Sequence, residues 1–189
     1  MGRRDDAGTA GVDTGVVDTK AVDTDAVPVR AGLPPVFAPD ARLLILGSFP
    51  GEASLAAAQY YAHPRNQFWP ILSALLDEPL AAMPYDARLD CLRARRVALW
   101  DVIERCRRTG SLDSAIRDPR GNALEDLLAR APGIRAAAFN GKTAGRMEPL
   151  LRDLGLRTYV MPSTSPANAS FTLRAKLDAW SVLRSDGWL

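Results

Sequence analysis

The sequence predicts an α/β fold of three layers, with a central four-stranded parallel sheet flanked by helices. Two observations predict it. Short runs of aliphatic and β-branched residues alternate with longer segments in which apolar residues return every three or four positions. This alternation is typical of parallel strands joined by crossover helices. At 189 residues and 47% hydrophobic composition, the chain has the size and apolar content of one domain.

The first 32 residues differ in composition from the rest. They contain no aromatic residue and repeat Val-Asp-Thr with a five-residue period, at 12–14, 17–19 and 22–24. Three such short copies could not close the core of a β-solenoid. We therefore expect residues 1–32 to be a disordered low-complexity tail and residues 33–189 to form the domain, which begins at Leu33-Pro-Pro-Val-Phe37.

Within the domain, four segments have the short apolar pattern of buried strands, and each ends in polar or turn-forming residues. They are Arg42–Ser48, Arg96–Val102, Ile134–Gly141 and Leu156–Pro162. The carboxyl ends of parallel strands meet at one edge of a sheet, where ligands bind. The loops at that edge therefore hold the candidate functional residues.

Helices are expected between and after these strands. Apolar residues recur with helical spacing in Gln67–Leu76, Asp86–Arg95, Asn122–Ala131, Thr143–Leu154 and Thr172–Arg184. Asn122, with Glu125 three residues on, predicts a capping box at the start of the third of these helices.

Composition excludes several classes of protein. The two cysteines, Cys91 and Cys106, match no zinc or disulfide pattern, which favours a reducing cytoplasmic location. No stretch approaches the ~20 apolar residues of a membrane helix, so a soluble protein is expected. The net charge is +2, but residues 1–30 hold six Asp against four Lys or Arg, which leaves about +4 on the remainder. That excess is compatible with binding to DNA.

The first strand leads into Gly47-Ser48-Phe49-Pro50-Gly51. The glycines permit a close approach of a ligand to the backbone, and an ordinary strand-to-helix turn explains the pattern equally well. No Gly-Lys-Ser/Thr follows, which disfavours a phosphate-binding loop.

The ten residues from Tyr60 to Trp69, YYAHPRNQFW, combine aromatic side chains with the only histidine and an amide. Aromatic rings can stack on a base that has left the double helix, and an amide can bind its edge or a water molecule. We take Tyr60, Tyr61, His63 and Asn66 as functional candidates. Phe68 and Trp69 have the pattern of core residues, and Arg65 that of a solvated cation.

The last strand leads into a loop, 162–170, of small hydroxyl residues and two prolines. Ser163, Thr164, Ser165 and Asn168 could donate hydrogen bonds to phosphate oxygens, and the stiff loop would suit a minor-groove wedge. A surface turn before the final helix is the alternative. This loop is therefore a candidate DNA contact.

The middle strands contribute three more candidates. Asp101 or Asn140 could read a base edge, and Lys142, at a helix start, could meet a phosphate. Asp101 could equally be a helix N-cap, and Lys142 a solvated residue.

The chemistry available to these residues is limited to amides, hydroxyls and a carboxylate. There is no Gly-x-Ser-x-Gly elbow and no Walker lysine, and one histidine is too few for most metal sites. Cleavage of an N-glycosidic bond suits such a set, because the enzyme need only stabilise charge and position a water molecule.

With these loops assembled, the chain resembles the uracil-DNA glycosylase superfamily, and most closely its hypoxanthine-DNA glycosylase branch. Five motifs in order carry the resemblance over about residues 35–185, namely GSFPG, SLAAAQYYAHPRNQFWPIL, LWDVIERCRRTGSLDSAI, FNGKTA and MPSTSPANAS. The resemblance implies a DNA repair enzyme that needs no metal or cofactor. It implies a monofunctional hydrolase that acts on a deaminated base, hypoxanthine or xanthine, flipped out of double-stranded or single-stranded DNA, and leaves an abasic site.

The resemblance also implies roles for individual residues. Much of the superfamily carries an Asp or Asn in the first motif, where this chain has Ser48 and Phe49. The Asn of HPxN, here Asn66, is the group that compensates in the hypoxanthine branch, so Asn66 is expected to orient the attacking water. The backbone of residues 47–50 would border the base pocket, and Tyr60 or Tyr61 would stack on the base.

Three other functions stay open on the sequence. The same fold could excise uracil or mismatched thymine, bind damaged DNA without turnover, or bind a free nucleoside or small metabolite. The missing first-motif Asp or Asn is the main support for the non-catalytic binder. A monomer is the expected assembly.

Overall fold

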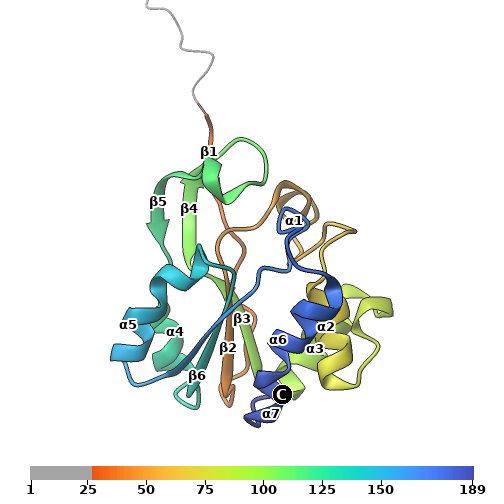
Figure 1. Ribbon diagram of the computed structural model, residues 1–189. Helices are drawn as coiled ribbons and strands as arrows, with labels where there is room; N and C mark the ends of the chain where they lie inside the picture. Colours follow the sequence, from red (N-terminus) through yellow and green to blue (C-terminus); the bar gives the residue numbers. More distant parts are fainter. Residues whose placement is uncertain (1–26) are drawn as a thin grey trace, which may run out of the picture.

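The computed structural model describes residues 27–189 and contains the predicted three layers (Figure 1). The central sheet has four parallel strands in the order β3-β2-β6-β7. They are β2 (Leu43–Gly47), β3 (Val97–Asp101), β6 (Ala136–Asn140) and β7 (Arg157–Met161). Each lies inside one of the four predicted segments, so the predicted sheet is confirmed.

Alternate residues of each inner strand enter two separate cores. On β2, Leu43 and Ile45 belong to one buried cluster, and Leu44 and Leu46 to the other. This follows from the two-residue period of a strand that is covered by helices on both faces. All five residues of β2 are buried, which explains its uninterrupted apolar sequence.

Helices cover both faces of the sheet (Figure 1). One face carries α2 (Phe68–Leu76), α3 (Tyr85–Ala94), α6 (Leu173–Trp180) and α7 (Val182–Ser185), with the short η1 (Leu80–Ala82) between α2 and α3. The other face carries α4 (Leu124–Arg130) and α5 (Glu148–Asp153), preceded by η3 (Ala144–Met147). A short helix, α1 (Glu52–Ala57), follows β2.

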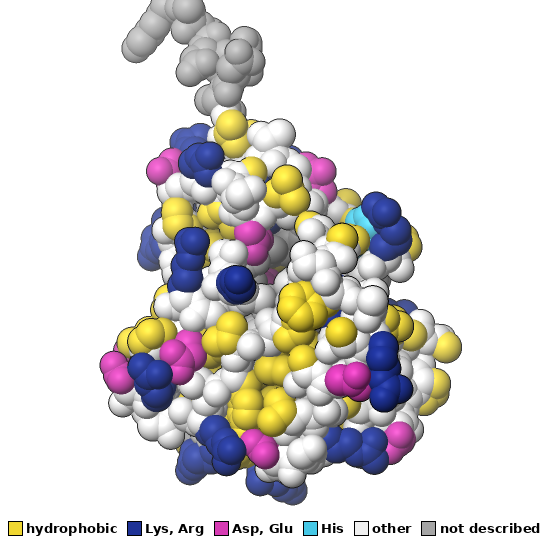
Figure 2. Space-filling model, viewed as in Figure 1, with side chains coloured by type: hydrophobic (Ala, Val, Ile, Leu, Met, Phe, Trp, Pro, Cys, Tyr) yellow, Lys and Arg dark blue, Asp and Glu magenta, His cyan; other side chains and the backbone are white. Residues whose placement is uncertain are grey.

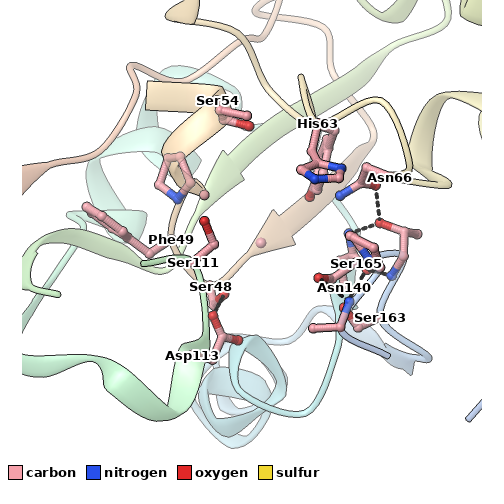
Figure 3. A pocket seen from close by; sticks show the side chains of 18 of the residues that line it. Ser48, Phe49, Ser54, His63, Asn66, Ser111, Asp113, Asn140, Ser163 and Ser165 are labelled. Carbon is pink, nitrogen blue, oxygen red and sulfur yellow. Dashed lines mark hydrogen bonds between the residues drawn. The ribbon is translucent and has the colours of Figure 1, made fainter. Parts of the chain in front are cut away.

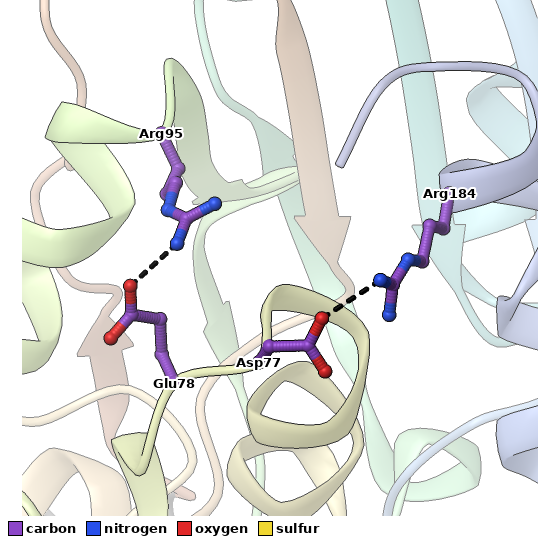
Figure 4. Close-up of polar contacts among 4 residues, drawn as sticks. All are labelled: Asp77, Glu78, Arg95 and Arg184. Carbon is purple, nitrogen blue, oxygen red and sulfur yellow. Dashed lines mark hydrogen bonds and ion pairs between the residues drawn. The ribbon is translucent and has the colours of Figure 1, made fainter.

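Ion pairs connect the end of α2 to its neighbours (Figure 4). Asp77 pairs with Arg184 of α7 at 2.8 Å, and Glu78 pairs with Arg95 after α3 at 2.5 Å. Because these side chains are partly exposed, each pair contributes about 1 kcal/mol or less. The apolar cores, not these pairs, fix the helices in place.

A second sheet was not predicted. Its three antiparallel strands, in the order β1-β4-β5, are β1 (Val29–Ala31), β4 (Ile103–Arg107) and β5 (Arg117–Gly121), and η2 (Asp113–Ala115) lies between β4 and β5. Strand β1 lies within the segment expected to be a tail, so the ordered domain begins at Val29 or earlier. The Val-Asp-Thr repeats lie outside the described residues.

The two sheets are joined almost directly. Only Val102 separates the end of β3 from the start of β4. Its N–H donates to the Gly47 carbonyl at 2.9 Å, and the Ile103 N–H donates to the Ser48 carbonyl at 3.1 Å. The small sheet is therefore fastened to the strand edge at which the functional loops were expected.

Two helix predictions need correction. Asn122 does not cap α4, which has Ala123 at its N-cap; the Asn122 amide instead donates to the Asp101 carbonyl at 2.8 Å. The predicted final helix is divided at Ser181 into α6 and α7. At the start of α6, Thr172 does act as a cap, because its hydroxyl accepts the Ala175 N–H at 3.1 Å.

Candidate active site

A cavity of about 320 Å³ opens at the carboxyl ends of the parallel strands. It lies where β2 has β3 on one side and β6 on the other, the position at which ligands bind in open α/β sheets. The surface is hollowed on this side of the molecule, and Lys and Arg side chains lie near the hollow (Figure 2). Its size is in the range of small-ligand pockets and suits one nucleobase.

The structure brings together all the predicted site residues except Lys142. The walls include Gly47, Ser48, Phe49, Pro50, Tyr60, Tyr61, His63, Asn66, Asp101, Asn140, Ser163, Thr164, Ser165 and Asn168. Lys142 is exposed and does not line the cavity. Figure 3 shows how the labelled side chains surround the space.

Asp101 is the buried carboxyl of the site. It ends β3, is 3% exposed, and its Oδ2 has no hydrogen-bond partner within residues 27–189. Burial, and to a lesser degree the nearby Asp113, raise its pKa to about 7, although Arg108 opposes the shift. Asp101 is therefore not a helix N-cap. Near neutral pH it can act both as a donor, when protonated, and as an acceptor, when ionised.

Gly47 makes room for this carboxyl. The two residues are register partners at the ends of β2 and β3. A Cβ at position 47 would lie 2.2 Å from Asp101 Oδ1, far inside contact distance. The strand must therefore end in glycine for Asp101 to occupy its position.

The amide of Asn66 is held in one orientation. Its Oδ1 accepts the Phe68 N–H at 3.0 Å and the Thr164 hydroxyl at 3.0 Å. Because a backbone N–H can only donate, the amide oxygen must face Phe68, and the amide nitrogen faces away from it, on the cavity side (Figure 3). Asn66 thus presents an N–H donor to the cavity, since both lone pairs of its oxygen are in use.

Asn140 and Thr164 support Asn66 from behind. The Asn140 amide nitrogen donates to the Thr164 hydroxyl at 2.9 Å, and the Thr164 N–H donates back to Asn140 Oδ1 at 2.8 Å. Thr164 is fully buried. The Thr164 side chain is therefore part of this network. It does not have the predicted role of a phosphate contact, because it is buried and cannot reach a phosphate. Asn140 is likewise occupied in bracing the loop after β7.

The two tyrosines have different surroundings. Tyr60 is 3% exposed, and its hydroxyl lies 3.1 Å from the Pro34 carbonyl, so its ring belongs mainly to the core. Tyr61 has a positive φ of 54° and stacks on Phe68 at 3.8 Å between ring centroids. Its buried hydroxyl has no hydrogen-bond partner within residues 27–189. Tyr61 is thus the tyrosine with an unused polar atom at the cavity.

His63 lies beside Asn66 on the cavity wall (Figure 3). Its Nδ1 accepts the Arg65 N–H at 3.1 Å. In the neutral ring the proton is therefore on Nε2, which makes that atom a donor.

The loop after β2 is held by a segment that the sequence analysis did not single out for chemistry. The Ser48 hydroxyl donates to Asp113 Oδ1 at 2.8 Å. The buried Arg108 guanidinium lies over the Phe49 ring at 4.9 Å and donates to the Pro50 carbonyl. Burial lowers the pKa of Arg108. These contacts fix the shape of the Phe49 and Pro50 wall.

Eight cavity-lining residues were not among the predicted site residues. Five of them lie close in sequence to predicted ones, namely Gly51, Ala53, Ser54, Pro166 and Ala167, and Ser111, Leu112 and Asp113 form a separate group. These three belong to the connection between β4 and β5 and lie inside the motif LWDVIERCRRTGSLDSAI, which carried the resemblance. No chemical type marks them as functional, so only their place in that motif could have indicated them.

The loop after β7 is anchored from below. The Trp180 indole donates to the Pro162 carbonyl at 3.0 Å, and the Lys176 ammonium to the Asn168 carbonyl at 3.0 Å. Lys176 is buried, and desolvation lowers its pKa. Within the loop, the Ser163 and Ser165 hydroxyls accept the N–H groups of Ser165 and Ala167. The loop is therefore rigid at the rim of the cavity.

Residues 27–189 contain neither a metal-binding cluster nor a membrane-spanning helix. No group of three or more His, Cys, Asp or Glu side chains there is placed to hold a metal ion. No helix in that part of the chain is long and apolar enough to cross a membrane.

A three-layer α/β domain with a base-sized cavity at its strand edge, walled by amides, aromatic rings and a carboxyl, defines a class of nucleobase-binding enzymes. Comparison with known proteins gives the family. A family model described as the uracil DNA glycosylase superfamily matches residues 34–184. The chain belongs to this superfamily.

Individual relatives agree with the family match. A hypoxanthine DNA glycosylase of Methanosarcina barkeri is 38% identical over 152 residues, which are 80% of this chain and 96% of the relative. A hypoxanthine DNA glycosylase of Methanosarcina acetivorans is 38% identical over 82% of this chain and 99% of its own length. A solution NMR structure from Methanosarcina acetivorans, described as a candidate uracil DNA glycosylase, has a TM-score of 0.76 and 38% identity, and covers 84% of this chain and 98% of that one.

Proposed function

We propose that this protein is a monofunctional DNA repair glycosylase that hydrolyses the N-glycosidic bond of a deaminated base, hypoxanthine first, and leaves an abasic site. The observation that carries the proposal is the Asn66 amide, fixed by two hydrogen bonds so that its N–H faces a base-sized cavity. The relatives named hypoxanthine DNA glycosylase support the choice of base.

Asn66 positions the attacking water. An amide has no useful basicity, so its contribution is to hold the water oxygen through the N–H while the sugar develops positive charge. The pre-set orientation reduces the entropy lost when the water is ordered. A water molecule that attacks an oxocarbenium-like sugar has to be correctly positioned more than it has to be activated by a base.

Asp101 reads the edge of the flipped base. Hypoxanthine, xanthine and uracil all carry a protonated ring nitrogen next to a carbonyl, and an ionised Asp101 accepts that N–H. Adenine and cytosine, the parents of hypoxanthine and uracil, have a lone pair at the same ring position, which the carboxylate repels. We prefer Asp101 to Asn140 because the Asn140 amide is engaged by Thr164 on both its atoms.

The rim of the cavity holds the DNA strand that carries the lesion. Ser163, Ser165 and Asn168 lie on the rigid loop after β7, where hydroxyl and backbone donors meet phosphate oxygens. Tyr61 and Phe49 enclose the faces of the base, and Lys142, outside the cavity, contributes charge near the strand. We further propose that the protein acts as a monomer in the cytoplasm, on double-stranded and single-stranded DNA.

The test is single-turnover excision from duplexes that contain deoxyinosine, deoxyxanthosine or deoxyuridine, with alkaline cleavage of the abasic product. We expect excision of deoxyinosine to be fastest, and Asn66→Ala to reduce it about a hundred- to a thousandfold while binding to the same duplex persists. Gln59→Ala, which removes an amide from the same segment outside the cavity, serves as the control.

Each outcome decides between functions. Undiminished excision by Asn66→Ala would refute the role of Asn66. Preference for deoxyuridine would favour the uracil-directed alternative. Binding without cleavage of any substrate would favour a non-catalytic damaged-DNA-binding protein.

A further inference from the structure

The connection between β4 and β5, residues 108–116, forms one rim of the cavity, and we call it the hairpin tip. Its backbone is fastened to the loop after β2 and to α1. The Glu52 N–H donates to Ser111 Oγ at 2.9 Å, the Gly110 N–H to Glu52 Oε1 at 3.1 Å, and Ser48 binds Asp113. The tip is therefore held at a fixed height beside the cavity.

Leu112 projects from this fixed backbone without cover. It lines the cavity, yet its side chain is 56% exposed, and the residues on both sides of it supply the anchoring hydrogen bonds. A lone exposed leucine is ordinary on a protein surface. A leucine held by its two neighbours at the mouth of a base-sized cavity is placed to contact whatever enters.

Among residues 27–189, the opposite rim of the cavity has no large aliphatic side chain in its lining. The cavity-lining residues of the loop after β7 are Ser163, Thr164, Ser165, Pro166, Ala167 and Asn168, all small or polar. When a nucleotide leaves a duplex, the base stack must be filled, and proteins use apolar wedges such as leucine for this purpose. Leu112 is the large aliphatic side chain at the cavity rim that can do so.

The strands behind Leu112 are strongly basic. Arg105 is the register partner of Arg120, and Arg107 that of Arg117, with a register shift between the two pairs, while Cys106 points into the core. The Arg117 guanidinium also donates to the Ser114 and Ile116 carbonyls. Like charges opposite one another destabilise a sheet. Glu104 and Asp118 pair with Arg120 and Arg107, but Arg105 and Arg117 have no ion pair within residues 27–189. A polyanion is the partner that such a hairpin fits.

We propose that the β4–β5 hairpin is a DNA-binding arm, with its arginines against the phosphates that flank the lesion and Leu112 inserted in the base stack. The inference rests on the proposed function, because it needs a nucleotide in the cavity. The major groove is wide enough to admit a two-stranded ribbon such as this hairpin. The arginines can also bind the DNA phosphates without entering the groove.

The wedge is tested with Leu112→Ala on deoxyinosine in duplex and in single-stranded DNA. We expect single-turnover excision to fall at least about tenfold from the duplex and by less than about twofold from the single strand, because only the duplex must be unstacked. Leu112→Met should restore most of the duplex rate. Leu154→Ala and Phe171→Ala, which remove exposed apolar side chains that do not line the cavity, are the controls.

A second measurement separates the wedge from the chemistry. The fluorescence of 2-aminopurine next to the lesion reports unstacking and needs no cleavage. Wild-type protein should raise it and Leu112→Ala should not. Equal loss on both DNA substrates, or an unchanged fluorescence rise, would overturn the wedge. Wild-type protein that cleaves neither substrate but raises the fluorescence would contradict the proposed function alone.

The arm is tested by the salt dependence of binding. The double variant Arg105→Gln, Arg117→Gln should lower the slope of log K against log salt by about 1 to 2, one for each lost phosphate contact. The control is Arg93→Gln, Arg95→Gln on and after α3, at the opposite end of β3 from the cavity. An unchanged slope in the hairpin variant would exclude the arm.

Discussion

At the scale of single residues, Asp101 is the side chain whose proposed role in reading the base is coupled to a cost in stability. It is buried without a partner for Oδ2 within the described part of the chain, and its folded-state pKa of about 7 lies well above the 3.8 of an exposed Asp. The folded protein therefore holds a proton that the unfolded chain releases between about pH 4 and 7. The free energy of unfolding falls as the pH rises through that window, by up to about 4 kcal/mol.

The corresponding prediction concerns Asp101→Asn. Because an amide has no charge to bury, we expect the variant to have a higher Tm than wild type at pH 8 and a similar Tm at pH 4, while excision is lost. Thermal unfolding at the two pH values checks this. An equal shift of Tm at both would mean that the carboxyl is not protonated on folding.

The residue types in the sequence indicated most of the site residues, but not the role of each one. Asp101 and Asn140 were predicted from strand ends and Asn66 from the segment Tyr60–Trp69, and all three line the cavity. Only the structure reveals that Thr164 forms hydrogen bonds with Asn140 and orients the Asn66 amide, because those contacts join residues up to 98 positions apart. A sequence pattern identifies strand ends and not the partners that each side chain has there.

At the scale of elements, the neighbouring strand β3 restricts the residue at the end of β2 to glycine. We expect Gly47→Ala to reduce excision at least about tenfold, because the new Cβ would lie 2.2 Å from Asp101 Oδ1 and must displace the carboxyl. Single-turnover kinetics measure the effect. Gly121→Ala, whose Cβ would have its nearest neighbour at 3.8 Å, is the matched control and should retain the wild-type rate. Wild-type activity in Gly47→Ala would show that the position of Asp101 is unimportant.

The strands that were predicted and those that were missed differ in their burial. The four parallel strands are apolar because helices cover both faces, and such runs are readable in sequence. β4 (IERCR) is only partly buried, and β5 (RDPRG) is exposed throughout and contains a proline. β4 and β5 pair because they form a hairpin that is attached to β3. No local sequence pattern encodes this arrangement. The wrong capping box at Asn122 has a similar cause, since its amide is used by β3 instead.

At the scale of the whole molecule, charge is distributed more unevenly than the net value indicates. The net charge of the whole chain is only +2. The β4–β5 hairpin nevertheless carries four arginines in its two strands, and acidic residues of the chain offset them in the total. Formal charge is therefore a weak guide to the electrostatic surface that meets the DNA.

Val102 links the two sheets directly. It is the one residue between the end of β3 at Asp101 and the start of β4. Its N–H donates to the carbonyl of Gly47, the last residue of β2, and its own carbonyl accepts the Asn122 N–H that follows β5. A displacement of the proposed arm would therefore be passed on to Asp101, the carboxyl proposed to read the base. Binding energy from phosphates outside the cavity can then be used for alignment at the scissile bond. A duplex trimmed on the arm side should consequently lose single-turnover rate at saturating enzyme, and not affinity alone, so that the protein senses an intact flank before it cuts.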